Sequence, residues 1–210
     1  MTRTRPLRVA LSLTAPLVFL LEGRSAFAQA PAEPGAPPAQ ALDAGGSWNV
    51  FASYGQASAP RSQGFAEAAT LSVAREFALG SHFSWGIELT PVFVVNQTRV
   101  DLPDRPREVA YAVAVAPVFA WTYMPKGSRC GLRLEGAVGI FWGFSPIPAE
   151  GSQFNFLDEF AGLVLVRAGG DHVVSFGIRR VHVSNLGLAG SDNPGLSFYS
   201  GAVGLSWPAR

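Results

Sequence analysis

A histidine and a serine two positions apart, in the stretch "HVSNLG" at 182–187, are the side chains best suited to chemistry. In an extended strand, residues i and i+2 lie on one face, roughly 6.6 Å apart along the chain. The imidazole of His182 can therefore meet the hydroxyl of Ser184 and remove its proton, which activates a nucleophile. Asn185 and the backbone N–H near Gly187 are candidates to hold the negative oxygen of a tetrahedral intermediate. The H-x-S pattern is also ordinary for polar interface residues, so the surrounding elements decide its meaning.

The composition indicates one domain with an unusually apolar sequence. The 210 residues suffice for one sizeable core. Charged residues make up 15% of the chain, against roughly 25% in soluble domains. Beyond residue 30, no apolar run reaches the ~18–20 residues of a membrane helix. The net charge of +1 and the scattered basic residues give no footprint for nucleic acid, and the single cysteine, Cys130, excludes an intramolecular disulfide. A very apolar soluble core and a membrane β-barrel both remain compatible with these numbers.

The N-terminus has the three parts of a secretory signal peptide. Basic "MTRTRPLR" is followed by apolar "VALSLTAPLVFLL" and by the small residues of "SAFAQA". We expect a signal peptide over residues 1–28, with cleavage after Ala28 or Ala30. The Pro-, Ala- and Gly-rich stretch 29–46 predicts an extended linker. The folded domain is then residues 47–210.

Eight strand-like segments fill this domain, and several alternate strictly between two faces. In 108–124, bulky residues such as Tyr111 and Phe119 alternate with a row of alanines. A soluble barrel or a lipocalin-like carrier places its bulky row inside, whereas a membrane barrel turns that row to lipid and keeps small or polar residues within. We therefore expect an all-β, eight-stranded antiparallel transmembrane barrel of the outer-membrane type. The segments are 47–55, 67–79, 82–96, 108–124, 131–144, 154–167, 172–185 and 196–207.

Charged residues on the inner rows predict ion pairs that fill a narrow lumen. They are Glu76, Glu88, Arg133, Glu135 and Arg179. Pro91 and Pro117 each remove a ladder hydrogen bond from a strand. The adjacent acids Asp158 and Glu159 obscure the faces of their segment, and a β-bulge is one way to account for them.

Loop lengths orient the barrel and place the HxSN stretch. Short connections at 79–81, 125–129 and 168–171 alternate with longer ones, as do periplasmic turns and external loops of outer-membrane barrels. Segment 172–185 then runs outward, with Phe176 and Ile178 on its lipid-facing row. His182 and Ser184 continue this row, so we expect them on the outer wall at the level of the outer leaflet.

The residues 179–207, with "HVSNLG", then "NPG" and a final strand, resemble the lipid A 3-O-deacylase (PagL) family. The strand pattern extends this likeness loosely over 47–207. The resemblance implies an eight-stranded barrel of the bacterial outer membrane that hydrolyses the ester-linked 3-hydroxyacyl chain at position 3 of lipid A, without cofactor or metal. It implies Ser184 as nucleophile, His182 as base, and Asn185 and Gly187 as oxyanion-hole candidates. Lipid A, or lipopolysaccharide, is then the substrate and outer-membrane lipid the surroundings; a homodimer is compatible with this.

The chain departs from the family at the acid that orients the histidine. The family has a glutamate at the second position after the NPG glycine, where this sequence has Ser197. Ser197 falls on the lipid-facing row, on the same face as His182. Either Asp192 in the loop replaces the acid, or Ser197 holds the imidazole by a neutral hydrogen bond, or the enzyme has lost most of its catalytic rate. The alternative to an esterase is a non-catalytic outer-membrane barrel with an envelope-structural or adhesive role.

Overall fold

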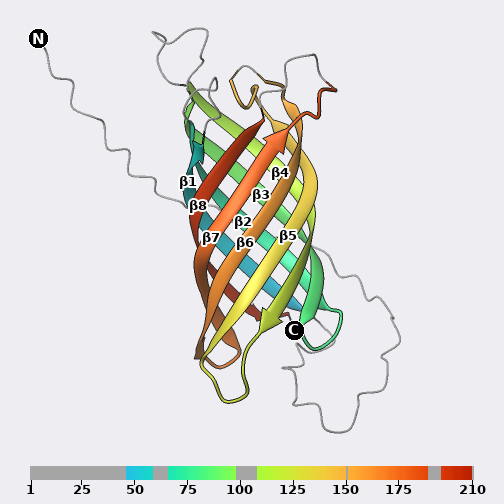
Figure 1. The fold of residues 1–210 in the computed structure, drawn as a ribbon, viewed down its shortest axis with the longest axis vertical. Coiled ribbons are helices and arrows are strands. Elements are labelled where there is room, and N and C mark those ends of the chain that lie inside the picture. Colours follow the sequence, from blue (N-terminus) through green and yellow to red (C-terminus); the bar gives the residue numbers. More distant parts are fainter. Residues whose placement is uncertain (1–45, 59–65, 98–107, 150, 189–194, 210) are drawn as a thin grey trace, which may run out of the picture. The chain divides into compact units, whose positions relative to one another are not determined.

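The structure, a computed structural model, describes residues 46–58, 66–97, 108–149, 151–188 and 195–209. These residues form one closed barrel of eight strands (Figure 1). The strands are β1 (Ser47–Ser58), β2 (Ala66–Ala78), β3 (Phe83–Gln97), β4 (Glu108–Tyr123), β5 (Cys130–Gly143), β6 (Phe154–Gly169), β7 (His172–Ser184) and β8 (Leu196–Pro208). The expected strands are confirmed with shifts of a few residues at their ends. The predicted signal peptide, and the linker up to its last residue, lie outside the described residues.

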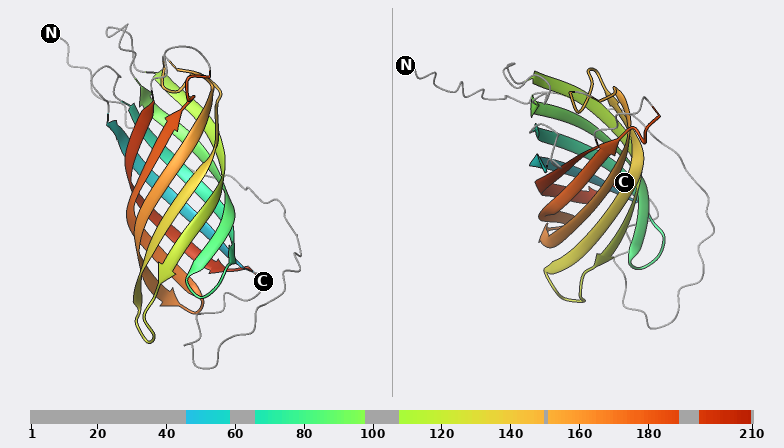
Figure 2. Two further views of the ribbon diagram at one scale, coloured as in Figure 1. Left: turned by 45° about the vertical axis from the view of Figure 1, so that its right-hand side comes forward. Right: turned by 45° about the horizontal axis from the view of Figure 1, so that its top comes forward.

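Each strand pairs antiparallel with its neighbours in sequence, and β1 pairs with β8 to close the cylinder (Figure 2). The end of β7 and the start of β8 therefore meet at the end of the barrel opposite the β6–β7 turn (Figure 1). Among the described residues, no helix is long and apolar enough to cross a membrane.

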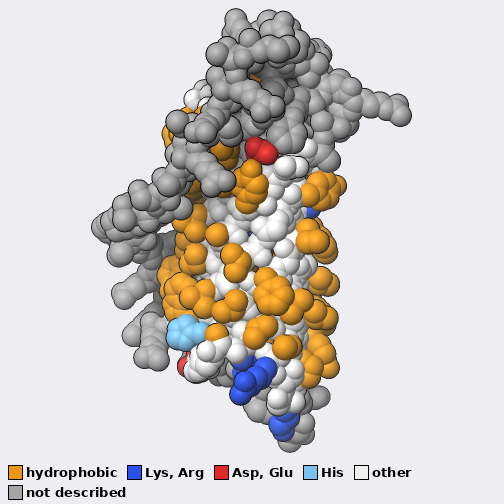
Figure 3. All heavy atoms as spheres, turned by 90° about the vertical axis from the view of Figure 1, so that its left-hand side faces the viewer, with side chains coloured by type: hydrophobic (Ala, Val, Ile, Leu, Met, Phe, Trp, Pro, Cys, Tyr) orange, Lys and Arg blue, Asp and Glu red, His pale blue; other side chains and the backbone are white. Residues whose placement is uncertain are grey.

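The bulky row faces outward, as the alternation predicts. In β4 the inward-facing alanines, such as Ala112 and Ala114, are buried, whereas Phe119 is 58% exposed. On β7, Ile178 is 66% exposed. Hydrophobic side chains are spread over the outer wall in Figure 3, with basic ones near its lower end. Such a surface suits lipid, and it excludes a lipocalin-like carrier with its bulky residues inside.

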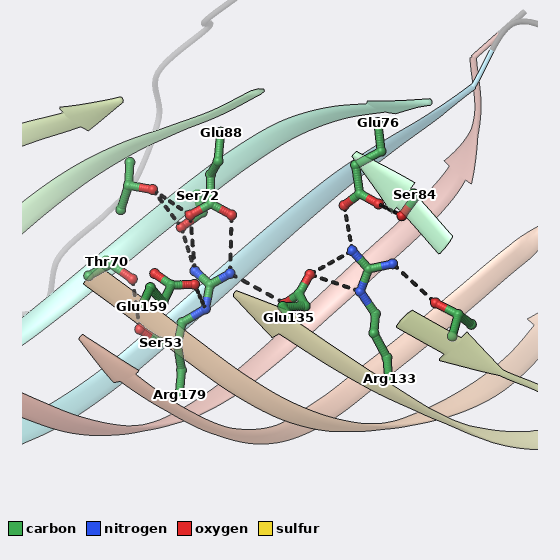
Figure 4. Close-up of polar contacts among 12 residues, drawn as sticks. Ser53, Thr70, Ser72, Glu76, Ser84, Glu88, Arg133, Glu135, Glu159 and Arg179 are labelled. Carbon is green, nitrogen blue, oxygen red and sulfur yellow. Dashed lines mark hydrogen bonds and ion pairs between the residues drawn. The ribbon is translucent and has the colours of Figure 1, made fainter. Parts of the chain in front are cut away.

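A network of charged side chains crosses the lumen between strands far apart in the sequence (Figure 4). Arg133 on β5 pairs with Glu76 on β2 and, at 2.6 Å, with Glu135 on its own strand. Arg179 on β7 is 2.9 Å from Glu159 and 3.1 Å from Glu88. The predicted pairing of inner-row charges is confirmed.

Glu159 joins the network as a member that the sequence analysis did not assign. It is 6% exposed and comes from β6. The guanidinium of Arg179 also lies 4.8 Å from the ring centroid of Phe51. The lumen is therefore filled by side chains in mutual contact.

The β-bulge that the sequence left open at Asp158 and Glu159 is not present in β6. Pairing of β5 with β6 runs without a register shift through both residues, and β6 alternates in burial along that region. Asp158 faces outward and Glu159 inward. The two adjacent acids need no bulge because consecutive side chains of a strand point to opposite faces.

The two prolines leave gaps in pairing without ending their strands. Pro117 is aligned with Ile87 of β3, but the β4–β5 register skips it between Val115 and Val118. Pro91 is likewise aligned with β4 and skipped by β2. Proline has no backbone N–H, so each one removes a ladder hydrogen bond on one side of its strand and leaves the pairing on the other side in place.

Candidate active site

The candidate residues gather where β7 ends and β8 begins. His182 and Ser184 lie on the row of β7 that also carries Phe176 and Ile178, so their expected face is the observed one. Ser184 is nevertheless only 7% exposed, and His182 is half-buried. The serine is thus sheltered rather than open on the wall.

The imidazole of His182 is held by a hydroxyl from the neighbouring strand. His182 and Ser197 are direct partners in the β7–β8 register. Their side chains meet at 2.8 Å between Nδ1 and Oγ. When Nδ1 carries the proton and donates it to Ser197, Nε2 is left as the hydrogen-bond acceptor, which is the tautomer that a general base needs.

Gly195, at the entrance to β8, borders the other side of the imidazole. A Cβ atom placed on it would be 3.2 Å from Nε2 and 2.8 Å from Cε1 of His182, and 3.7 Å from Cβ of Ser184. Both His182 Nε2 and Ser184 therefore lie against the same glycine. Gly195 was not predicted as a site residue. The feature that could have indicated it is its place in the "NPG" stretch, directly before a strand.

The turn after β7 is built from side-chain and backbone hydrogen bonds. Leu186 and Gly187 have φ values of 55° and 76°, in the left-handed region. The Leu186 N–H donates to Oγ of Ser184 at 3.2 Å, and the Gly187 N–H donates to Oδ1 of Asn185 at 2.8 Å. The two oxyanion-hole candidates, Asn185 and Gly187, are therefore hydrogen-bonded to each other. The N–H that donates to Ser184 Oγ belongs to Leu186, which was not predicted as a site residue.

Two acids near the histidine have different places in the structure. Asp192, the candidate substitute acid, lies outside the described residues. Asp158 of β6 is the direct register partner of His182 on the side opposite Ser197, and its carboxylate is bound by Arg180 at 2.8 Å. In the described part of the chain, no group of three or more His, Cys, Asp or Glu side chains could hold a metal ion.

Comparison with known proteins matches this chain to a family. The family model "Lipid A 3-O-deacylase (PagL)" matches residues 66–206, from the start of β2 to near the end of β8. Comparison with the curated proteins gives no match.

Two solved structures share the barrel. The crystal structure of the outer membrane enzyme PagL is 20% identical, with a TM-score of 0.52, over 77% of this chain and 99% of that one. The crystal structure of Neisserial surface protein A (NspA) is 10% identical, with a TM-score of 0.59, over 79% of this chain and 97% of that one. At these identities the likeness shows the fold, which is the eight-stranded barrel of outer-membrane proteins. The match of the family model over most of the chain goes further: this chain belongs to the lipid A 3-O-deacylase (PagL) family.

Proposed function

We propose that this chain is a serine esterase of the bacterial outer membrane that removes the ester-linked 3-hydroxyacyl chain at position 3 of lipid A. One observation carries the proposal. The imidazole of His182 is fixed at Nδ1 by Ser197, and its Nε2 borders the same glycine as Ser184. This arrangement lies on the outward row of a barrel of the PagL family, where a lipid ester can reach it.

The reaction follows from these positions as two acyl transfers. His182 Nε2 takes the proton of Ser184 Oγ, and the oxygen attacks the ester carbonyl carbon. The tetrahedral intermediate collapses, and the sugar hydroxyl leaves with the proton from His182. Water then attacks the acyl-serine while His182 takes its proton. Collapse of the second intermediate returns that proton to Ser184 and releases the 3-hydroxy fatty acid.

Donors for the negative oxygen come from the turn after β7. The Leu186 N–H already approaches Ser184 Oγ, so it lies close to the carbon that Oγ attacks. The Gly187 N–H can join it once its hydrogen bond to Asn185 Oδ1 opens, and the side-chain amide N–H of Asn185 is a further candidate donor. Backbone N–H groups aimed at a developing oxyanion are worth several kcal/mol in other acyl transfers, ~3–4 kcal/mol for one donor.

Ser197 is the orienter that the geometry favours. A hydroxyl can hold the imidazole in one tautomer, but it carries no charge to stabilise the imidazolium that forms on proton transfer. A slower enzyme than one with a carboxylate is the expected consequence. Asp192 is the competing acid, and mutation of each residue separates the two.

The orientation of the barrel completes the proposal. With the short β2–β3, β4–β5 and β6–β7 turns in the periplasm, the end of β7 lies at the outer leaflet, where lipid A is found. All proposed groups come from a single chain, so one barrel suffices for the reaction.

The test compares lipid A from cells that express the wild type, Ser184→Ala or His182→Ala. We expect mass spectrometry to show loss of one 3-hydroxyacyl chain with the wild type and intact lipid A with both variants. Ser175→Ala is the matched control, because Ser175 is a buried serine of the same strand on the lumen row. It should leave deacylation unchanged.

Unheated and boiled samples on detergent gels verify that each variant forms a barrel. Intact lipid A in wild-type cells would instead favour the non-catalytic barrel. Equal deacylation by the wild type and Ser184→Ala would remove Ser184 as the nucleophile.

A further inference from the structure

An ion pair stands on the outer wall beside the candidate site. Arg180 Nη1 and Asp158 Oδ1 are 2.8 Å apart, and the two side chains are 38% and 47% exposed. Both belong to the rows that face outward. In the register, Arg180 is flanked by Phe160 and Tyr199, and Asp158 has Val138 as its partner on β5. Ionisable side chains among lipid-facing residues are costly, and where they occur they commonly mark function.

The pair lies one register step from the proposed nucleophile. Ser184 is directly opposite Phe156, and Asp158 is two residues further along β6, opposite His182. Such diagonal neighbours have their Cα atoms ~7–8 Å apart. Arg180 lies two residues before His182, about 6.6 Å nearer the barrel centre along the strand. The ion pair therefore sits on the hydrocarbon side of Ser184, where the chain of a bound acyl ester would run.

We propose that Asp158 and Arg180 bind the 3-hydroxyl of the acyl chain that is cleaved, and so select 3-hydroxyacyl esters over esters that lack this hydroxyl. The inference rests on the proposed function. An attacked carbonyl carbon lies ~3–3.5 Å from Ser184 Oγ, and the 3-hydroxyl is only two carbons further along the chain. The path from Ser184 Oγ through the carbonyl carbon to the 3-hydroxyl, followed by a hydrogen bond of ~2.7–2.8 Å, matches the diagonal separation between Ser184 and Asp158.

The chemistry of the pair fits a hydroxyl because it offers both halves of the contact. The Asp158 carboxylate accepts the hydroxyl proton, and an N–H of the Arg180 guanidinium donates to the hydroxyl oxygen. A plain alkyl chain would cover the pair and make no hydrogen bond with it, so its transition state gains less from binding than that of the hydroxylated chain. A phosphate is a poorer occupant, since the pair is neutral as a whole and lies on the hydrocarbon side of the ester rather than beside the sugar.

The experiment uses the full chain folded in detergent and two synthetic 3-O-acylated glucosamine lipids in mixed micelles. One carries a 3-hydroxymyristoyl ester and the other a myristoyl ester. For the wild type, we expect kcat/KM to favour the hydroxylated ester about 10- to 100-fold. Asp158→Asn and the charge-balanced double variant Asp158→Asn/Arg180→Gln should lose most of this preference. The loss should fall on the 3-hydroxymyristoyl ester, and kcat/KM for the myristoyl ester should not decrease.

Arg75→Gln is the matched control. Arg75 is an arginine on the outward row of β2, where its guanidinium lies 5.2 Å from the ring centroid of Trp48, and it should leave the preference intact. An equal loss on both esters would mean that the pair acts on His182 and not on the hydroxyl, which overturns the inference. A wild type that hydrolyses both esters equally well would also overturn the inference, but it would leave the proposed function standing. A wild type that hydrolyses neither ester refutes the proposed function as well.

Discussion

At the scale of single residues, the hydrogen bond between His182 Nδ1 and Ser197 Oγ is the contact through which the proposed mechanism orients the imidazole. Ser197→Ala removes the orienting group and should lower kcat by about tenfold or more. Ser197→Glu should raise kcat, because a carboxylate both orients the ring and stabilises the imidazolium. Turnover of lipid A in mixed micelles measures both effects.

Asp192→Asn then separates the two candidate orienters. Unchanged activity leaves the role with Ser197 or water, the outcome we expect. Loss of most activity, with partial recovery in the double variant Asp192→Asn/Ser197→Glu, would assign the role to Asp192. A Ser197→Glu variant that folds and gains nothing would mean that a carboxylate at 197 does not reach the imidazole.

At the scale of elements, the close approach of the start of β8 to the end of β7 shapes the site. Gly195→Ala would place a methyl group 2.8 Å from Cε1 of His182, so the ring must leave its observed position. A misplacement of about 1 Å in a reacting group costs roughly 100-fold, and we expect a loss of that order in kcat. Gly201→Ala, also in β8, is the control because a Cβ there meets nothing within 4 Å. Equal activity of the two variants, measured on the same micelles, would show that the approach does not matter.

At the scale of the whole molecule, the lumen network joins strands from around the barrel. Arg179 is 1% exposed and contacts carboxylates from β3, β5 and β6. Arg179→Met leaves these carboxylates without their shared cation, so unfolding in urea should become easier by about 3–5 kcal/mol.

The control for this variant is Arg129→Met, which removes one positive charge from the exposed β4–β5 turn and should change stability little. An Arg179→Met barrel as stable as the wild type at neutral pH would mean that the network fills space without holding the strands together.

The strands could be predicted from the sequence because their physics is local. A period of two reports the two faces of a strand, and its bulky row reports which face meets lipid. The same alternation placed His182, Ser184 and Ser197 on one face and the charges Glu76, Glu88, Arg133, Glu135 and Arg179 on the other. The faces of the segment with Asp158 and Glu159 could not be assigned from sequence, because two adjacent acids hide the alternation of apolar residues.

Register and loop geometry came only from the tertiary structure. A period of two states the face of each residue but not its partner on the next strand. Hence the 2.8 Å contact of His182 with Ser197, the pairing of Asp158 with His182 and the entry of Glu159 into the Arg179 network all depend on how neighbouring strands align. The bond between Asn185 and Gly187, and the position of Gly195 against the imidazole, depend on how the chain turns between β7 and β8. Sequence alone determined a barrel with a histidine and a serine on its lipid-facing wall; closure of that barrel decided which groups touch them, because contacts between strands are set by all eight strands together.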